Sequence, residues 1–446
     1  MATDPTDFDN DASAIRIGPP ARLDSLPPAG FLPREPKTWE ESGLDVALVE
    51  QIVLRLLARE GASQGRQVAH ELALSAGLLK DLLELLKGQK LVQLRGSTPT
   101  GDFIWELTES GRHAALEHRK MSTYIGPAPV PFSQYVKGVQ AQTLANLRPT
   151  RDDLFRAFED MTLSRGLIDA IGPAIASGRA LFLYGEPGNG KTSIAERVTR
   201  SFGDTIWIPI TLLIDGHIVK LYDPAVHVHQ TGTSKTLSVM ERADRRWVRI
   251  QRPTVIAGGE LTLDMLEIQR NPVSGVCEAP LQLKANCGTL VIDDFGRQRI
   301  DPLTLLNRWI FPLERRVDYL RLPDGRKIPA PFDPLLVFST NIDPATLVDE
   351  AFLRRIPYKV RVPDPTRDEF VALTTRQAAI MHVTLPPGSV AYLVDKHYRT
   401  RPMRFCHPRD LLQQVVDYAK YAQQEAVATG DAWDNAVGNY FGTAPG

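Results

Sequence analysis

Cysteine is scarce in this chain: its 446 residues include only Cys277, Cys287 and Cys406. An odd and sparse count provides no disulfide framework, and the spacing of the three thiols matches no metal-binding motif. Such usage is typical of the reduced cytoplasm. No apolar run approaches the ~20 residues of a membrane-spanning helix, and the acidic segment 1–4 lacks the apolar stretch of a signal peptide. We therefore expect a cytoplasmic protein without a membrane span.

An excess of charge is also lacking, because 52 Lys and Arg residues stand against 53 Asp and Glu residues. The net charge of −1 excludes a general electrostatic attraction to nucleic acid or anionic lipid. A hydrophobic content of 43% and a charged content of 24% are typical of a soluble globular protein. The length is too great for one simple core, so we expect about two to four domains.

The segment 185–192 has the form G-x-x-x-x-G-K-T, a phosphate-binding loop of nucleoside triphosphatases. Its glycines let backbone N–H groups turn toward phosphate oxygens, Lys191 supplies positive charge, and the Thr192 hydroxyl can coordinate Mg²⁺. The apolar run 180–184 predicts a buried parallel strand before the loop, and 193–202 predicts a helix after it. The predicted nucleotide-binding residues here are Gly185, Glu186, Pro187, Gly188, Asn189, Gly190, Lys191, Thr192 and Ser193.

Polar residues end two further apolar runs. The run 289–292 is followed by Asp293 and Asp294, and the run that starts at residue 335 ends in Asn341. Carboxylates at the carboxyl end of a parallel strand lie beside the phosphate loop. We predict that Asp293 holds Mg²⁺ and that Asp294 polarises the attacking water. Asn341 can reach that water or the γ-phosphate.

Arginines at two positions complete the predicted site. The segment 349–356 predicts a helix that contains the pair Arg354 and Arg355 near its end, and Arg409 lies at the start of an apolar helix at 411–422. An arginine supplied across a subunit boundary stabilises the charge of a phosphoryl-transfer transition state. An Arg-Arg pair is more often part of a solvated helix face. Only the position of this pair in the chain therefore supports a catalytic role across a subunit boundary. Arg409 could reach back to the γ-phosphate from a helical lid.

This set of motifs, in this order, resembles the AAA+ ATPase family over roughly residues 151–430. The resemblance implies a parallel-sheet P-loop α/β core with a C-terminal helical lid, which binds ATP and Mg²⁺ and assembles with itself into a hexamer. It assigns the motifs in chain order: Walker A at 185–192, Walker B at 290–294, sensor 1 at Asn341, the arginine finger at Arg355 or alternatively Arg354, and sensor 2 at Arg409.

Two features distinguish this chain within the family. Many members have Asp-Glu where this chain has Asp293-Asp294. Because the Asp294 side chain is shorter than that of glutamate, the attacking water must lie closer to it or turnover must be slower. Asp324-Gly325 between two strand-like runs predicts a β-hairpin just before the sensor-1 strand. A hairpin at this place resembles the MoxR-like and related branches, in which it faces the ring pore or the substrate.

The region before the ATPase core predicts a second folded module. Three helical patterns followed by two strand-like runs and another helix are the pattern of a small α+β winged helix-turn-helix domain. The expected organisation is a disordered Pro-rich arm at 1–36, the winged-helix-like domain at 37–122, a linker at 123–150, the ATPase core at 151–362, and the lid with a C-terminal tail at 363–446.

The charge of this module bears on its partner. Between residues 40 and 120 there are 10 basic and 12 acidic residues, a balance of 10 − 12 = −2. The candidate recognition helix, 75–87, has no Arg, Asn or Gln to contact base edges. A duplex-binding module would normally have a basic face. Docking of a protein or of the ATPase ring is therefore favoured over DNA binding.

We thus expect an ATP-hydrolysing, Mg²⁺-dependent ring that remodels an unidentified protein partner. One alternative is a DNA-associated ATPase, such as a transposition helper, helicase loader or transcriptional regulator, that uses the winged helix. Another is a nucleotide switch that binds ATP but hardly hydrolyses it. Salt-dependent DNA binding and the steady-state release of phosphate distinguish the three.

Overall fold

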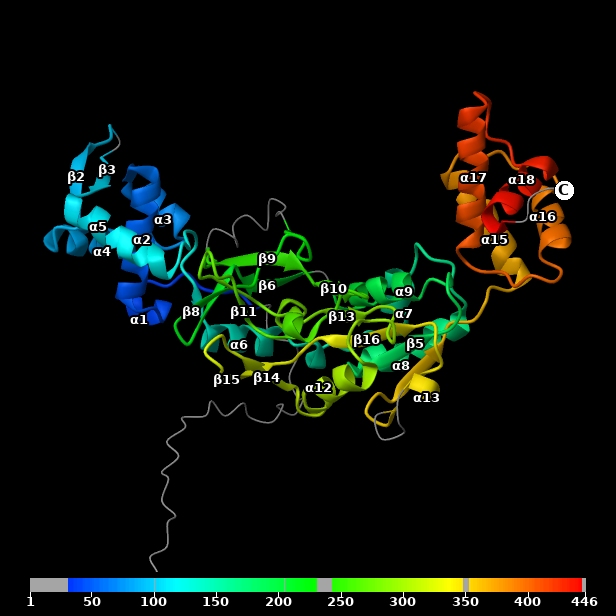
Figure 1. The fold of residues 1–446 in the computed structure, drawn as a ribbon, viewed down its shortest axis with the longest axis horizontal. Helices are drawn as coiled ribbons and strands as arrows, with labels where there is room; N and C mark the ends of the chain where they lie inside the picture. Colours follow the sequence, from blue (N-terminus) through cyan, green and yellow to red (C-terminus); the bar gives the residue numbers. More distant parts are fainter. Residues whose placement is uncertain (1–30, 100, 204, 231–242, 348–352, 443–446) are drawn as a thin grey trace, which may run out of the picture. The chain divides into compact units, whose positions relative to one another are not determined.

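A computed structural model describes residues 31–442 apart from residues 100 and 204 and the segments 231–242 and 348–352 (Figure 1). Most of the predicted disordered arm, 1–30, lies outside the described residues. The remainder, 31–36, differs from the prediction. Arg34 forms an antiparallel β-bridge with Ala243, and the Phe31 ring lies 5.4 Å from that of Trp247. Backbone pairing and an aromatic contact therefore hold residues 31–36 against the rest of the protein.

The N-terminal module has the predicted order of helices and strands. It contains α1 (Trp39–Ser42), α2 (Val46–Glu60), β1 (Ala62–Gln64), α3 (Gly65–Glu71), α4 (Ala76–Gly88), β2 (Val92–Ser97), β3 (Phe103–Leu107) and α5 (Glu109–Met121). Both β1 and β2 pair antiparallel with β3. The hydroxyls of Ser75 and Thr108 accept backbone N–H bonds at the starts of α4 and α5, which fixes where these helices begin.

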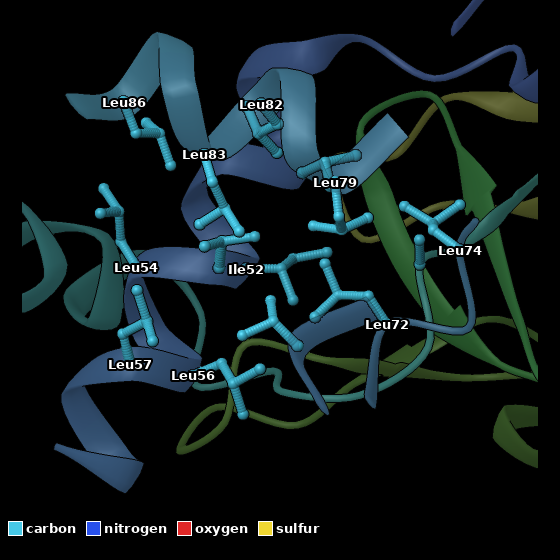
Figure 2. Packing of buried hydrophobic residues seen from close by; sticks show 14 of the residues in the cluster. Ile52, Leu54, Leu56, Leu57, Leu72, Leu74, Leu79, Leu82, Leu83 and Leu86 are labelled. Carbon is cyan, nitrogen blue, oxygen red and sulfur yellow. The ribbon is translucent and has the colours of Figure 1, made fainter. Parts of the chain in front are cut away.

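A leucine-rich core holds this module together. Figure 2 shows Leu79 and Leu83 of α4 pointing toward Ile52 of α2, and all three side chains are at most 1% exposed. The 3–4 residue spacing of apolar positions on each helix produces these facing stripes. Burial of each such side chain contributes roughly 1.5–3 kcal/mol. The apolar pattern of the sequence is therefore used for packing within the module.

The ATPase core is built on a parallel sheet. Within the described residues its five strands lie in the order β10-β13-β16-β5-β17 (Figure 1). They are β5 (Leu181–Tyr184), β10 (Thr254–Ala257), β13 (Thr289–Ile292), β16 (Leu335–Thr340) and β17 (Tyr358–Arg361). After β5 the chain forms β10, β13 and β16, which all lie on one side of β5, and it then places β17 on the other side. The phosphate loop thus leaves β5 at the topological switch point, where ligands bind in open α/β sheets.

Helices cover both faces of this sheet because strand side chains alternate. Leu181 and Leu183 belong to one buried cluster and Phe182 to another. The first cluster includes apolar residues of α7 (Arg151–Ala157), α8 (Arg165–Ser177) and α9 (Lys191–Val198), and the second includes those of α12 (Pro302–Arg315). Strands that are buried on both faces consist almost entirely of apolar residues, as the sequence predicts.

The predicted linker, 123–150, is largely folded. It contains β4 (Val130–Pro131) and α6 (Phe132–Gln142), and β4 joins a second sheet of order β11-β12-β8-β7-β4 in the described chain. Tyr135 of α6 is 2% exposed, and its hydroxyl donates to the Leu283 carbonyl at 3.2 Å. The proline-rich composition suggested a spacer, but burial of this apolar helix against the insertion outweighs the extended tendency of prolines.

Apart from β4, the second sheet comes from the long insertion between α9 and β13. The insertion contains η2 (Thr199–Phe202), β6 (Thr205–Pro209), β7 (Thr211–Ile214), β8 (His217–Lys220), β9 (Trp247–Gln251), η3 (Leu263–Leu266), β11 (Gln269–Arg270), β12 (Cys277–Glu278) and α11 (Leu281–Lys284), together with β10 of the parallel sheet. Two short helices lie outside it, η1 (Leu144–Asn146) and α13 (Pro344–Leu347). β6 and β9 form an antiparallel pair. This insertion therefore has its own sheets and core, which the sequence pattern did not reveal.

The predicted hairpin consists of β14 (Val317–Arg321) and β15 (Lys327–Pro331). Leu320 and Ala330 are fully buried in a cluster with residues of the second sheet. Asp318 is also buried and bonds to Arg308 through an Nη1–Oδ1 distance of 2.5 Å. Tyr319, Arg321 and Lys327 are exposed, as is the turn around Asp324. One face of the hairpin is therefore structural, and its other face and its turn can meet a partner.

Helices form the C-terminal region: α15 (Arg367–Ile380), α16 (Ser389–His397), α17 (His407–Tyr421) and α18 (Gly430–Phe441). Trp433 is fully buried at their centre. The predicted fold class is thus confirmed: a parallel-sheet P-loop α/β core is followed by a helical lid. Across the described segments, none of the helices combines the length and apolar character that crossing a membrane requires.

Candidate functional site

The phosphate loop joins β5 to α9 and depends on glycine at its closest contacts. Gly185 and Gly188 have φ angles of 141° and 82°. A Cβ on Gly185 would lie 2.5 Å from the Val362 carbonyl oxygen, and one on Gly188 would lie 2.5 Å from Sγ of Cys406. Any larger residue would displace these neighbours. The loop is thus held between the end of β17 and the lid.

Lys191 is the first residue of α9 and is only 6% exposed. Its Nζ donates to the carbonyls of Gly185 and Glu186, both at 3.0 Å, and to Oδ1 of Asn341 at 2.5 Å. Burial lowers the pKa of Lys191, while the carboxylates of Asp293, Asp294 and Glu186 act in the opposite direction. The ammonium is therefore fixed between the Walker A loop and the sensor-1 strand.

Thr192 and the two aspartates meet at the same edge of the sheet. The Thr192 hydroxyl donates to Oδ2 of Asp293 at 2.8 Å. Nδ2 of Asn341 lies 3.4 Å from Oδ1 of Asp294. A hydroxyl and a carboxylate side by side are the hard oxygen ligands that Mg²⁺ prefers. The residues present thus fit a magnesium ion, with Thr192 and Asp293 as its ligands.

The lid brings a second arginine to the site besides the predicted one. Arg409 lines the site, but its side chain is 68% exposed and bonds to its neighbour Asp410. Arg404 is 15% exposed and bonds to Glu186 of the phosphate loop at 3.0 Å and to Asp364. Sequence reasoning missed Arg404. Several arginines lie close together before α17, and only the loop geometry distinguishes among them.

A cavity of about 680 Å³ connects the loop with the lid. Its polar end contains the phosphate-loop residues with Asp293, Asp294 and Asn341, and its other end contains Met161, Leu163, Leu373 and Ile380. The volume is within the range of small-molecule sites. The polar end suits phosphates, and the apolar end suits a flat base. Arg376 and Gln377 of α15 also line it and were not predicted.

The predicted arginine finger lies elsewhere. Neither Arg354 nor Arg355 is among the described residues that line this cavity. Nε of Arg355 donates to Glu314 of α12 at 2.7 Å. Most of the helix predicted at 349–356 falls outside the described residues. The structure therefore brings together every predicted site residue except this pair.

Comparison with known proteins adds limited information. A family described as a domain of unknown function (DUF8689) matches residues 366–439, which form most of the lid. No curated protein matches the chain. Among solved structures, NtrX from Brucella abortus in complex with ATP has a TM-score of 0.41 at 13% identity, over 63% of this chain and 55% of that one. The Holliday junction branch migration motor RuvB of Thermotoga maritima has a TM-score of 0.36 at 16% identity, over 64% and 72% of the two chains.

These likenesses limit what can be transferred. The chain spans about 55% of the length of NtrX. Because both TM-scores are low, no residue role is taken from either protein. The description of the matched lid family also assigns no activity. The functional argument therefore depends on the sequence motifs and on the geometry of the site itself.

Proposed function

We propose that this protein is an AAA+ ATPase that binds ATP with Mg²⁺ and hydrolyses it. The observation that carries the proposal is the convergence of Lys191, Thr192, Asp293 and Asn341 at one edge of the parallel sheet, where Lys191 bonds to Asn341 at 2.5 Å and Thr192 to Asp293 at 2.8 Å. Residues from three separate strand ends contribute to this group. A strand-ending turn without a ligand would not require an ammonium, two carboxylates and a hydroxyl in one cavity.

Each residue has a chemical task in this proposal. Lys191 contacts the β- and γ-phosphates once its bonds to the Gly185 and Glu186 carbonyls are exchanged for phosphate oxygens. Thr192 and Asp293 would hold Mg²⁺, which when bound supplies positive charge to the phosphates. Asp294 orients and polarises the attacking water, and Asn341 holds that water from the neighbouring strand. The N–H groups at the start of α9 point toward the phosphates.

The shorter Walker B acid affects the expected rate. Asp294 has a φ angle of 49°, a left-handed conformation that aspartate tolerates better than most residues. Its carboxylate is one methylene shorter than that of glutamate, so the water must bind closer to the strand. We infer slow turnover rather than none. Measurable phosphate release would distinguish such a slow ATPase from a nucleotide switch that hardly hydrolyses ATP.

Assembly into a ring, with a hexamer as the expected form, is part of the proposal. Arg355 is supported as the residue that acts in trans because it lies outside the cavity of its own chain and is oriented by Glu314. Arg354 is the alternative. The acidic balance of the N-terminal module supports a protein partner over DNA. Arg409 stays the proposed sensor 2, with Arg404 as the lid arginine already in contact with the loop.

The test compares three variants in nucleotide binding and phosphate release. Lys191→Ala should lose nucleotide binding, whereas Asp294→Asn should bind ATP and retain it. Lys420→Ala removes an exposed lysine of α17 and is the matched control. Unchanged turnover in Asp294→Asn would contradict the assigned role of Asp294. No nucleotide binding by the wild type would contradict the whole proposal.

Ring formation and partner are tested separately. Sedimentation with ATP should reveal oligomers, and Arg355→Ala should fail in uniform rings but recover in mixed ones. A strict monomer with every nucleotide would exclude the ring. Capture with the Asp294→Asn variant in ATP, with and without nuclease, distinguishes a protein partner from DNA. Nuclease-sensitive capture would favour the DNA-associated alternative.

A further inference from the structure

A second cavity lies within the N-terminal module, apart from the phosphate loop. Its volume is about 380 Å³, and it is bounded by α2, α5, the end of β3 and the segment that follows α5. Four arginines line it: Arg55, Arg59, Arg112 and Arg119. In the described part of the chain, its lining includes neither Asp nor Glu. Arg59 pairs with Glu60 at 2.8 Å and Arg112 donates to the Leu107 carbonyl at 3.1 Å, which leaves Arg55 and Arg119 as the arginines of interest.

Arg55 is the most informative of these residues, because it is only 4% exposed. Its Nη1 donates to the carbonyls of Ser122 at 3.2 Å and His118 at 3.4 Å, at the end of α5. Among the described residues, its Nε and Nη2 have no hydrogen-bond partner. These two nitrogens form one edge of the guanidinium, which can donate two parallel bonds to a carboxylate or phosphate. Both atoms are almost fully enclosed, so an anion reaches this edge only when neighbouring side chains shift.

Burial of a charged group without full hydrogen bonding is costly. Burial lowers the pKa of the Arg55 guanidinium, with a small opposing effect of Tyr124. Arginine nevertheless stays protonated in proteins, so it cannot relieve this cost by losing its proton. A bound anion would relieve it. The Nη1 bonds account for the structural role of Arg55, and they leave the other edge unexplained.

The remaining walls of the cavity are apolar. Leu107 is buried beneath it, Ile125 lines it, and Leu116 of α5 is 58% exposed. An inorganic ion would leave this apolar surface in water. A ligand with an anionic head and an apolar body would cover it and gain from its burial. The size of the cavity corresponds to a small molecule rather than to a nucleic-acid backbone.

We propose that this cavity binds a small organic anion, whose carboxylate or phosphate is held by the Nε–Nη2 edge of Arg55 and whose apolar body lies against Leu107, Leu116 and Ile125. Arg119, at an exposed position of the lining, adds to the positive charge. The site is independent of the proposed ATPase activity, because none of its residues lines the nucleotide cavity.

Calorimetric titration of the full chain tests this with two probes, octanoate and octyl phosphate. Octanol, which lacks the charge, and acetate and inorganic phosphate, which lack the apolar body, are the comparison ligands. We expect one site per chain for at least one of the two probes, with affinity at least about tenfold above that of all three comparison ligands. Preference for one probe identifies the head group. Equal weakness of all five ligands in the wild type would overturn the proposal.

Variants locate the binding. Arg55→Met should weaken binding of the preferred probe roughly tenfold or more. Arg55→Lys keeps the charge but loses the two-nitrogen edge, and should fall between Arg55→Met and the wild type. Arg119 is exposed, so Arg119→Gln should not affect folding, and it should weaken binding several-fold. The neighbouring Lys120 does not line the cavity, so the control Lys120→Gln should have no effect on binding.

Three further results would contradict the proposal. Full binding by Arg55→Met or Arg119→Gln would separate the probe from this cavity. Loss of probe binding in Lys191→Ala would assign it to the phosphate loop, and that loss would be visible whether or not the protein hydrolyses ATP. Displacement of the probe by a short DNA duplex would assign the arginines to a nucleic-acid interface.

Discussion

Lys191 in the phosphate loop and Arg55 in the N-terminal module are both cations that folding removes from water, but their surroundings differ. Lys191 has three hydrogen-bond acceptors around one ammonium and nearby carboxylates. Arg55 uses one nitrogen for two carbonyls, and Nε and Nη2 have no partner within the described structure. A buried cation with a full set of acceptors is stable without a ligand. One that is only half satisfied indicates a missing anion.

The largest expected effect is on the free energy of unfolding, and it comes from breaking a buried ion pair. Arg55, which has no such partner in the described structure, serves as the comparison. Arg246 is 1% exposed and bonds through Nε and Nη2 to Asp244. Arg246→Met leaves Asp244 buried without its cation and should lower the free energy of unfolding by about 3–5 kcal/mol. Arg55→Met should change it by no more than about 1 kcal/mol. Urea unfolding of both variants measures this, and equal losses would show that Arg55 is satisfied within the fold.

Nucleotide affinity is the next largest effect. Lys191→Ala should weaken ATP binding about 100-fold, since charge-assisted hydrogen bonds of roughly 1.5–3 kcal/mol are lost. Binding of octanoate in the N-terminal module should stay unchanged in the same variant. A fluorescent nucleotide titration and calorimetry measure the two affinities. Parallel loss of both would mean that the two cationic sites are one functional unit.

Gly188→Ala tests the contact between the phosphate loop and the lid. The new Cβ would meet Sγ of Cys406 at 2.5 Å, at a φ of 82°. We expect a loss of about 2 kcal/mol in unfolding free energy together with weaker ATP binding. Gly77→Ala is the matched control, because a Cβ at this position of α4 meets nothing within 4 Å. It should stabilise the protein by about 0.5 kcal/mol. Similar thermal melting of both variants would argue against a tight loop.

The smallest effect concerns His407, which is buried like Lys191 and Arg55 but can become neutral by losing a proton. Burial, together with Arg404, lowers its pKa from 6.5 to about 4. As the pH falls below 6.5, the unfolded chain takes up a proton that the native state does not. Stability is therefore complete above pH 7 and declines until about pH 4.

The size of this decline stays below about 2 kcal/mol at pH 5, the limit that the full pKa shift sets. Melting temperatures at pH 7 and pH 5 measure it. His407→Phe should reduce the difference between the two pH values, whereas His113→Phe, at an exposed position of α5, should not. An undiminished difference in His407→Phe would assign the pH dependence to other groups.

Much of the nucleotide site follows from local sequence, because its residues belong to short motifs at strand ends. Lys191 and Thr192 lie within one loop, and Asp293 follows an apolar run that could only be a buried strand. Arg404 was not predicted, because its role depends on where a loop of the lid meets the phosphate loop. The packed state of β4 and α6 was missed for a similar reason, since a proline-rich composition does not reveal a distant apolar partner.

The sequence by itself determined that this chain has a P-loop core, and it determined which residues lie at the carboxyl ends of the central strands, because short-range pattern sets strands, turns and loop glycines. The tertiary structure alone decided which arginine contacts the phosphate loop and that one face of the hairpin is buried. It also decided that Arg55, one arginine among many in the sequence, is enclosed with Nε and Nη2 left unpaired in the described structure. The physical reason is that burial and hydrogen-bond partnership depend on contacts between residues far apart in the chain, which no local pattern encodes.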